Sequence, residues 1–565
     1  MKNNYKPGYT KYLKMKKIAA IFFCAVFSFL TLAVLASAYD SGSYKDAPGG
    51  DVYNADDLIA ALGGEDAAGI FGDRVMLKSD IRLLNTVTIL RGSYMIDGGD
   101  CTIARGFDGG FMISVGVDGE DYSETAPELI LGYSGAYAAE DTLIIDGGSE
   151  NAVSDFIGSS KTEDEALSSA LIRVYGSLRI SDGTVIKNSG SCAIYNSGET
   201  YADGLEIENC VMPVYNDRDF SMISCRISGC AAKNGGAVFN AGKFAASECT
   251  FERNFAERGG DIYNAAQSSD SEEDRVIYSN ANEFISSSAS DCGGCIYNEA
   301  NFLDSGSRID GCTSKLGGFI YNTGSFETSG IFAQGCNGEN GGFAYNNGRL
   351  VLGSSGTVDE CKADKNGGGV YNDKSGELFI SGTMFSSNSA AFGGGVFNLG
   401  ETTFSGGTLT YNKADIGEAI LNDGRLYMTG SPVSNENNDI FIVTDGSAEH
   451  AIQIKSAITA PYTARLTPGI CENGEYKKSY KNGAVLIAGE YAKDKYTSFS
   501  VSESGASKWE LAEDGTISGG AFYNQIWFYA ALCAVIAVLI SVFVILKNRR
   551  KKIKTPAAEG DEQSN

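Results

Sequence analysis

Residues 317–326 read GGFIYNTGSF, and residues 341–350 read GGFAYNNGRL. The two segments lie 24 residues apart and share a Gly-Gly pair, an aromatic-Asn pair and an apolar residue four places after the Asn. This period is too short for a repeat of paired helices, and it lacks the Leu/Asn signature of leucine-rich repeats. Three short apolar runs separated by Gly and Asn instead predict one coil of a parallel β-helix, with successive coils about 4.8 Å apart.

The Asn of this repeat recurs at ten positions, and we expect it to form a buried ladder. Its side-chain amide can bond to the neighbouring coil, and Asn also tolerates the left-handed conformation of a bend. Ten places earlier stands a second set of small polar residues. The ladder positions are Asn196, Asn216, Asn240, Asn264, Asn298, Asn322, Asn346, Asn372, Asn398 and Asn422, and the second set is Cys230, Asn254, Ser288, Cys312, Cys336, Asn388 and Asn412.

An aromatic residue precedes nearly every ladder Asn, and an aliphatic residue precedes the aromatic. Because neighbours in a strand point to opposite faces, aliphatics in the core would place the aromatics outside, one ring per coil. Such a column would form a hydrophobic strip of aromatic rings on which the faces of sugar rings can stack. The alternative is that the rings pack inside or under a loop. The candidate strip is Tyr263, Tyr297, Tyr321, Tyr345 and Tyr371.

The repeat resembles a known family of surface proteins. Gly235-Gly-Ala-Val238, Phe251-Glu-Arg-Asn254 and Phe385-Ser-Ser-Asn388 are similar to the paired GGA[I/V/L] and FxxN repeats of chlamydial polymorphic outer membrane proteins and adhesin-like proteins. The resemblance covers residues 186–425 and implies a pectin-lyase-like right-handed β-helix. That family ends in a transporter β-barrel, whereas this chain ends in one apolar segment and a basic tail.

The whole chain is therefore expected to be an all-β protein, a right-handed parallel β-helix solenoid with a β-rich C-terminal cap. A helix capped by Asn54 should cover its first coil. The expected segments are a signal peptide at 1–38, the cap helix and irregular coils at 39–185, regular repeats at 186–430, the β-rich cap at 431–520, a transmembrane helix at 526–546 and a cytoplasmic tail at 547–565.

Both ends of the chain indicate export and membrane anchoring. Six Lys precede an apolar run that ends in Ala36-Ser37-Ala38, which predicts signal cleavage between Ala38 and Tyr39, with an uncleaved anchor as the alternative. Residues 526–546 contain no charge, follow an aromatic cluster and precede six Lys or Arg. By the positive-inside rule the large N-terminal region is extracellular and the tail cytoplasmic.

The charge of the body disfavours nucleic acid as a partner. The first 38 residues hold six Lys and no acid, and residues 525–565 hold six basic residues against three acids. Since the whole chain carries −26, the region between them carries −35. Such a surface repels phosphate backbones.

The cysteines and the acidic clusters are the chemical groups that could form bridges or bind metal. The cysteines in the polar set indicate free stacked thiols, with Cys292 and Cys295 the best candidates for a bridge. The sequence predicts no metal or cofactor; Asp97-Gly-Gly-Asp100 and Glu436-Asn-Asn-Asp439 are possible but unassigned Ca²⁺ sites, more simply solvated turns.

Catalysis is disfavoured by two observations. The single His, His450, lies outside the repeat, and the residues that follow the ladder Asn give no carboxyl pair in adjacent coils. Three functions follow from the sequence. The favoured one is a membrane-anchored, adhesin-like surface protein that binds glycans or other cells. The alternatives are a polysaccharide lyase or glycoside hydrolase and a structural envelope component.

Overall fold

The computed structural model describes residues 45–63, 73–122, 126–132, 142–157, 159, 162–266, 276–435, 438–444, 448–504, 508–519 and 526–552. The signal segment with its Ala38–Tyr39 junction, the acidic residue Glu436 and the tail beyond Lys552 lie outside these residues. The chain divides into two compact units, one up to Thr250 and one from Phe251. Each unit is described by itself.

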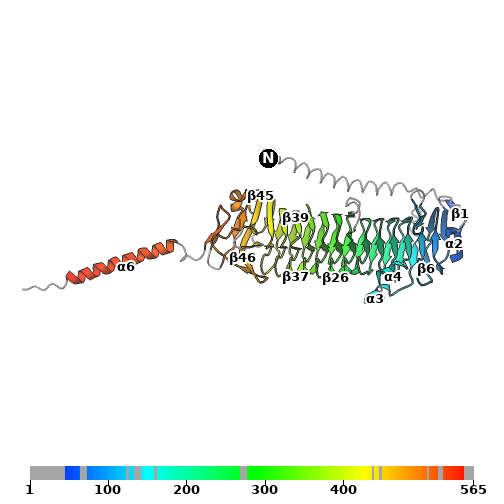
Figure 1. The fold of residues 1–565 in the computed structure, drawn as a ribbon, viewed down its shortest axis with the longest axis horizontal. Coiled ribbons are helices and arrows are strands. Elements are labelled where there is room, and N and C mark those ends of the chain that lie inside the picture. Colours follow the sequence, from blue (N-terminus) through cyan, green and yellow to red (C-terminus); the bar gives the residue numbers. More distant parts are fainter. Residues whose placement is uncertain are drawn as a thin grey trace, which may run out of the picture. The chain divides into compact units, whose positions relative to one another are not determined.

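In the first unit, short parallel strands stack on one another (Figure 1), and their pairing forms three columns. The column that contains the ladder Asn consists of β4 (Val87–Ile89), β7 (Ile113–Val115), β10 (Ile172–Val174), β13 (Ile194–Asn196), β16 (Val214–Asn216) and β19 (Val238–Asn240). The second contains β1 (Lys45–Val52), β2 (Asp73–Leu77), β5 (Ser93–Asp97), β8 (Glu128–Leu131), β11 (Ser177–Ile180), β14 (Glu199–Asp203), β17 (Asp219–Ile223) and β20 (Lys243–Ser247). The third contains β3 (Ile81–Leu83), β6 (Cys101–Arg105), β9 (Leu143–Asp146), β12 (Thr184–Lys187), β15 (Glu206–Glu208) and β18 (Arg226–Ser228).

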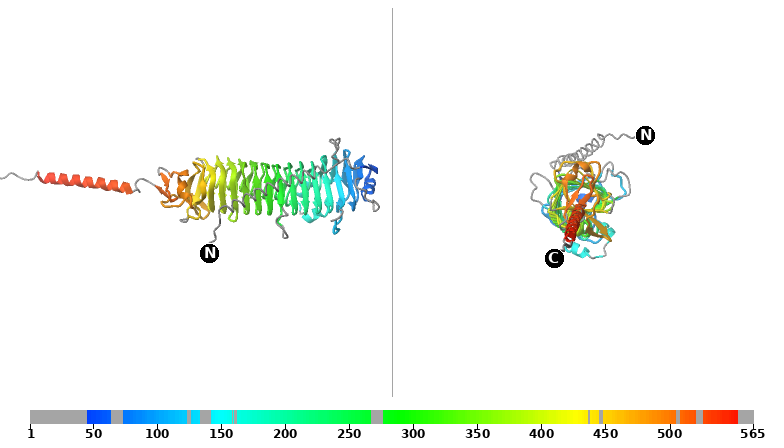
Figure 2. Two further views of the ribbon diagram at one scale, coloured as in Figure 1. Left: turned by 90° about the horizontal axis from the view of Figure 1, so that it is seen from above. Right: turned by 90° about the vertical axis from the view of Figure 1, so that its left-hand side faces the viewer.

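The second unit repeats this arrangement, and Figure 2 shows its stacked strands from a second direction. Its ladder column runs through β23 (Ile262–Asn264), β27 (Ile296–Asn298), β30 (Ile320–Asn322), β34 (Ala344–Asn346), β38 (Val370–Asn372), β40 (Val396–Asn398) and β42 (Ile420–Asn422). The second column contains β24 (Val276–Asn280), β28 (Asn301–Ser305), β31 (Ser325–Ser329), β35 (Arg349–Leu352), β39 (Glu377–Ser386), β41 (Glu401–Thr410) and β43 (Arg425–Ser434). The third contains β25 (Glu283–Ile285), β29 (Arg308–Asp310), β32 (Phe332–Gln334) and β36 (Thr357–Asp359), and then the second halves of the long strands. The predicted parallel β-helix is confirmed.

The parallel stack continues beyond the point where the sequence repeat ends. In the ladder column β42 pairs with β44 (Asp439–Val443), β44 with β46 (Ala464–Glu472) and β46 with β49 (Phe499–Val501). In the second column β43 pairs with β45 (Ile452–Ile458) and β45 with β48 (Ile487–Ala488). Two antiparallel pairs accompany this end: β46 with β47 (Glu475–Lys478), and β50 (Trp509–Leu511) with β51 (Ile517–Gly519).

Glycine lets successive coils approach closely. A Cβ atom built on Gly318 would lie 2.1 Å from the carbonyl oxygen of Gly342, and one on Gly342 would lie 2.2 Å from that of Gly368. No side chain fits at that distance, so the second Gly of each Gly-Gly pair is required by the next coil. The residues that follow these two glycines, Phe319 and Phe343, are buried in the core and stack 5.5 Å apart.

The bends of the coils differ from expectation in one respect. None of the ten ladder Asn has a positive φ. Each is the last residue of a three-residue strand in the ladder column. The left-handed residues instead directly precede the second set of polar residues, as Ser387 (φ 58°) precedes Asn388 and Tyr411 (φ 55°) precedes Asn412. The prediction that ladder Asn occupy left-handed bends is therefore wrong, and their hydrogen bonds are the reason for Asn at these positions.

Helices cover part of the first unit. Asn54 caps α2 (Ala55–Gly63) as predicted: the amide N–H of Asp57 donates to Asn54 Oδ1 at 3.0 Å. Leu58 and Leu62 of this helix are buried, and it packs against β1, β3 and β4. The short helices α3 (Ala152–Phe156) and α4 (Glu163–Leu167) bury Ala152 and Ala166.

At the end of the chain, α6 (Ile526–Lys552) contains one segment long and apolar enough to cross a membrane, Tyr529–Arg549, with a mean hydropathy of 2.9. This segment overlaps the predicted span at 526–546.

Candidate functional site

The ladder Asn side chains bond from coil to coil. Asn322 Nδ2 donates to Asn346 Oδ1 at 2.8 Å and to the carbonyl of Arg349 at 3.0 Å, and both Asn side chains are fully buried. Each amide therefore satisfies a side-chain acceptor and a backbone acceptor one coil away. The same Asn-to-Asn bond, at 2.7–2.8 Å, joins 196 to 216, 216 to 240, 264 to 298, 298 to 322, 346 to 372, 372 to 398 and 398 to 422.

A second buried polar column lies after the left-handed bends. Asn388 Nδ2 donates to Asn412 Oδ1 at 3.0 Å, and Asn412 Nδ2 donates to Asn438 Oδ1 at 3.1 Å. The sequence placed Ser288 in this set, but the structure places Ser287 there, since its Oγ accepts the N–H of Asn254. In that coil eleven residues, not ten, separate the column from the ladder, so a fixed offset selects the wrong neighbour.

The cysteines follow the predicted thiol column with one correction. Cys295 forms a disulfide with Cys312, with Cα atoms 6.1 Å apart, while Cys292 is a buried free thiol. Of the two predicted candidates for a bridge, Cys295 is therefore bonded and Cys292 is not, and Cys312 is bridged, not free. Cys295 points into the core from the position after the Gly-Gly pair, which brings it close to the polar column of the next coil. Cys230 and Cys336 are buried and form no disulfide, as expected.

The aromatic residues before the ladder Asn form stacked columns. Tyr263 and Tyr297 lie 4.8 Å apart at 4°, and Tyr345 and Tyr371 lie 4.7 Å apart at 16°. Tyr321 stacks between Tyr297 and Tyr345, at 5.1 Å from each. Because each ring covers the face of the next, the strip presents ring edges to a ligand, and the sugar-on-face stacking expected from the sequence has no free face along the run.

Neighbouring groups cover parts of this column. Tyr263 is only 6 % exposed, whereas Tyr297, Tyr321, Tyr345 and Tyr371 are half-buried. The last rings of the column pack against the β46–β47 hairpin, where Tyr476 lies 5.8 Å from Phe397. Carboxylates hold hydroxyls beside the column: Tyr345 donates to Asp373 at 2.8 Å, and Tyr476 donates to Asp423 at 2.9 Å. In the first unit, Tyr195 and Tyr215 pack against the residues of α3 and α4.

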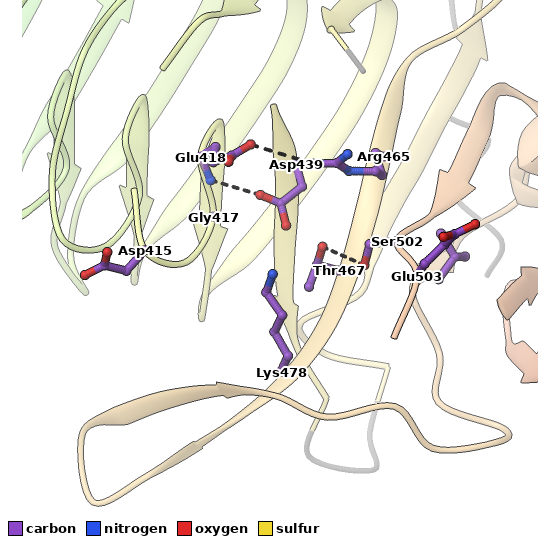
Figure 3. Close-up of a pocket in the computed structure, with 10 residues that line it drawn as sticks. Asp415, Gly417, Glu418, Asp439, Arg465, Thr467, Lys478, Ser502 and Glu503 are labelled. Carbon is purple, nitrogen blue, oxygen red and sulfur yellow. Dashed lines mark hydrogen bonds and ion pairs between the residues drawn. The ribbon is translucent and has the colours of Figure 1, made fainter. Parts of the chain in front are cut away.

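A charged pocket of about 500 Å³ lies where the last regular coil meets β44, β46 and β47 (Figure 3). Of its lining residues, only Asp439 belongs to a candidate site predicted from the sequence, the Ca²⁺ site at Glu436-Asn-Asn-Asp439. Its lining combines carboxylates, two cations and two hydroxyls, contributed by segments up to 88 residues apart. They are Asp415, Glu418, Asp439, Glu503, Arg465, Lys478, Thr467 and Ser502, together with Gly417 and Val501.

The pocket exists because the repeat fails at one position. Glu418 occupies the place of the second Gly of the Gly-Gly pair, which in the preceding coil is Gly394. A Cβ atom at Gly394 would lie 2.6 Å from the carbonyl oxygen of Glu418. The coil after Glu418 is built differently, with the buried Asp439 beside it, and therefore leaves room for a long side chain. The Gly-to-Glu change at 418 is the signal by which the sequence would have revealed this pocket.

Hydrogen bonds and charge fix the lining groups. The amide N–H of Glu418 donates to Asp439 Oδ1 at 3.0 Å, and Arg465 Nη2 lies 3.7 Å from Glu418 Oε2 (Figure 3). Burial, followed by the charge of Asp439, raises the pKa of Glu418, while Arg465 opposes the shift. Two residues after Arg465 on β46, Thr467 Oγ1 donates to Ser502 Oγ at 2.8 Å. The pocket thus holds both donors and acceptors in fixed positions.

The remaining candidates from the sequence show structural roles. Asp97 is buried and paired with Arg74, and Asp100 accepts the N–H of Thr142 at 3.0 Å. Among the described residues, no three or more His, Cys, Asp or Glu side chains gather in a way that could hold a metal ion. His450 does not lie apart from the coils: its carbonyl accepts the amide of the last ladder residue, Asn422, at 2.8 Å.

Comparison with known proteins adds no family. No protein-family model matches the chain, and no curated protein matches its sequence.

Proposed function

We propose that this protein is a membrane-anchored surface β-helix that binds glycans, with the charged pocket as its recognition site. In this proposal α6 lies in the cell membrane and the β-helix extends outside the cell. The resemblance of the repeat to those of chlamydial polymorphic outer membrane proteins and adhesin-like proteins supports this placement. The pectin-lyase-like, right-handed form of the β-helix belongs to the same proposal.

The observation that carries the proposal is the chemistry of the pocket lining. Sugars offer many hydroxyl groups, each both a donor and an acceptor. Carboxylates such as Asp415 and Glu503 accept from hydroxyls, and Lys478 donates to them. A volume of about 500 Å³ lies within the usual range for small-ligand sites.

The charge of the protein favours neutral glycans. Four carboxylates against two cations leave the pocket negative, and the body around it carries −35. Like charge would repel acidic polysaccharides. The ligand class proposed is therefore a neutral, hydroxyl-rich saccharide.

The test is glycan-array binding by the full chain in lipid nanodiscs. Binding to neutral glycans is expected, and Lys478→Ala should weaken it at least about tenfold, because a charged hydrogen bond contributes about 1.5–3 kcal/mol. The matched control is Lys477→Ala. Neighbours in a strand point to opposite faces, so this exposed residue of the same strand faces away from the pocket. Equal loss in both variants, or binding that neither variant changes, would reject the pocket as the site.

One observation favours hydrolysis as a second candidate function. Glu418 and Asp439 bring two carboxyl groups from adjacent coils into one pocket, an arrangement that the residues after the ladder Asn do not provide. A carboxyl group with a raised pKa suits a general acid, and burial raises the pKa of Glu418.

Incubation of the full chain with neutral polysaccharides distinguishes the two functions. Release of reducing ends that Glu418→Gln abolishes, with binding retained, would establish a hydrolase. Binding without turnover would establish a recognition module. Neither binding nor turnover would leave the structural envelope role.

A further inference from the structure

Three pairs of cysteines that form no disulfide in the structure lie one coil apart in the buried core. The first unit holds Cys210 with Cys230 and Cys225 with Cys249, and the second unit holds Cys336 with Cys361. All six side chains are at most 2 % exposed. Because the two members of each pair belong to successive coils, they lie beside each other in the stack.

The backbone pairing places these residues directly opposite each other. Asn337 pairs with Lys362, so the preceding residues, Cys336 and Cys361, are also in register. The bridge between Val211 and Ala231 does the same for the residues that precede them, Cys210 and Cys230. For the third pair, the N–H of Thr250 donates to the carbonyl of Cys225 at 2.9 Å.

The thiols themselves are in contact. The amide N–H of Cys210 donates to Cys230 Sγ at 3.4 Å. Burial, and then hydrogen bonding to the neighbouring thiol, raises the pKa of Cys210, Cys225 and Cys361. Neighbouring coils stand about 4.8 Å apart, within the Cα separation of 4.4–6.8 Å that a disulfide requires.

Cys210, Cys230, Cys336 and Cys361 lie in the second polar column, which joins coil to coil wherever it lacks cysteine. Cys225 and Cys249 lie at another bend, between the second and third strand columns. In the second polar column, Asn388, Asn412 and Asn438 form side-chain hydrogen bonds, and Ser287 accepts the N–H of Asn254. Cys312, which occupies this column one coil below Cys336, is already bonded covalently to an adjacent coil. A disulfide at Cys210–Cys230 or at Cys336–Cys361 would thus replace one inter-coil connection by another.

We propose that the pairs Cys210–Cys230, Cys225–Cys249 and Cys336–Cys361 are disulfide sites that close when the chain folds in the presence of a disulfide oxidant. One thiol of a pair, as thiolate, attacks the oxidant disulfide and releases one reduced thiol. The second thiolate then displaces the other half of the oxidant from the mixed disulfide. Each closure forms one S–S bond, consumes one oxidant disulfide, and yields two reduced oxidant thiols that carry the two protons. Because all six thiols are buried in the folded core, the oxidant reaches them while the coils are still open.

The test compares the full chain produced in a reducing and in a disulfide-forming expression compartment. After denaturation in N-ethylmaleimide and trypsin digestion, mass spectrometry reports which cysteines were free. Trypsin cleaves after Arg218, Arg226 and Arg349, so the two cysteines of each pair lie on different peptides. Disulfide-linked peptides for all three pairs are expected in the oxidised chain only. Cys101, which is buried in the first unit outside these pairs, should remain alkylated.

A variant separates specific pairing from general oxidation. In Cys361→Ser, Cys336 should become alkylated while the other two pairs still close, and the fold should be retained because Ser occupies this column elsewhere. In the parent chain, oxidation should raise the unfolding temperature, and a reductant should reverse the rise. Free thiols at all six positions in a chain whose Cys295–Cys312 disulfide has formed would overturn the proposal, as would cross-links in other combinations.

Discussion

At the scale of single residues, each ladder Asn connects its coil to the next through one side-chain amide. Asn346 accepts from Asn322 at 2.8 Å and donates to Asn372 at 2.8 Å and to the carbonyl of Gly348 at 3.0 Å. Replacing Asn346 by Leu leaves these partners buried without hydrogen bonds. We expect the free energy of unfolding to fall by about 1–3 kcal/mol, the cost of burying unsatisfied polar groups.

Denaturant unfolding of the full chain in detergent measures this loss. The matched control is Asn347→Leu, because the neighbouring Asn347 is half-exposed and should tolerate the change. Hydrogen exchange should increase mainly in the coils of Asn322 and Asn372, since a coil contacts only its neighbours. Equal stability of the two variants would show that the ladder contributes nothing.

Asp261 is a residue whose burial makes stability depend on pH. It is fully buried, and Asn254 Nδ2 donates to its Oδ1 at 2.9 Å. Burial raises the pKa of Asp261 to about 7, whereas an unfolded Asp has a pKa of about 3.9. Between these values the folded chain binds a proton that the unfolded chain has released. The stability that this bound proton contributes is therefore fully present below about pH 4 and is lost as the pH rises to about 7.

Asp261→Asn should remove this dependence. The Asn side chain is neutral at every pH, so the variant should be more stable than the parent at pH 8, and the difference should narrow toward pH 5 by up to about 1.4 kcal/mol per pH unit. Unfolding curves from pH 5 to 8 measure it, with the exposed Asp310→Asn as control. A parallel pH profile in Asp261→Asn and the parent would contradict the assignment.

At the scale of the coil, the second Gly of each pair sets how closely coils approach. Gly318→Ala would place a Cβ atom 2.1 Å from the carbonyl oxygen of Gly342. The backbone of the next coil must move, and we expect a loss of more than about 3 kcal/mol. Gly306→Ala is the control: Gly306 has a φ of +73° with nothing near its Cβ, so its cost is only the left-handed strain of about 1–2 kcal/mol. Thermal unfolding compares the two variants, and a smaller loss in Gly318→Ala would contradict this account of the repeat.

The same local rules explain how far the sequence predicts the structure. In the regular coils, each aromatic-Asn pair and each Gly-Gly pair contacts the equivalent residues of the next coil. The structure of one coil therefore predicts that of the next, and the ladder positions could be predicted from the period of the sequence. The Cys295–Cys312 disulfide joins two different columns, which spacing along the chain does not reveal. The pocket depends on Glu418, Asp439 and Arg465, which come together only because the parallel stack continues after the repeat has ended.

At the scale of the whole molecule, the chain combines an acidic body with basic ends. Residues 39–524 carry −35, and the segment that follows the apolar part of α6 is rich in Lys and Arg. Basic residues are retained on the cytoplasmic side of a membrane, and an acidic folded domain is compatible with the outside. These features give an orientation that can be tested directly.

Protease added to right-side-out membrane vesicles should remove the β-helix and leave a small fragment that begins near residue 520. Tyr529–Arg549 is long enough to cross the bilayer, and the positive-inside rule then places the residues after it on the protected side. An epitope tag after Asn565 identifies the fragment on an immunoblot, and vesicles opened with detergent serve as the control, in which the tag should also be lost. A tag that is digested in sealed vesicles, while the β-helix stays intact, would mean that the orientation is reversed.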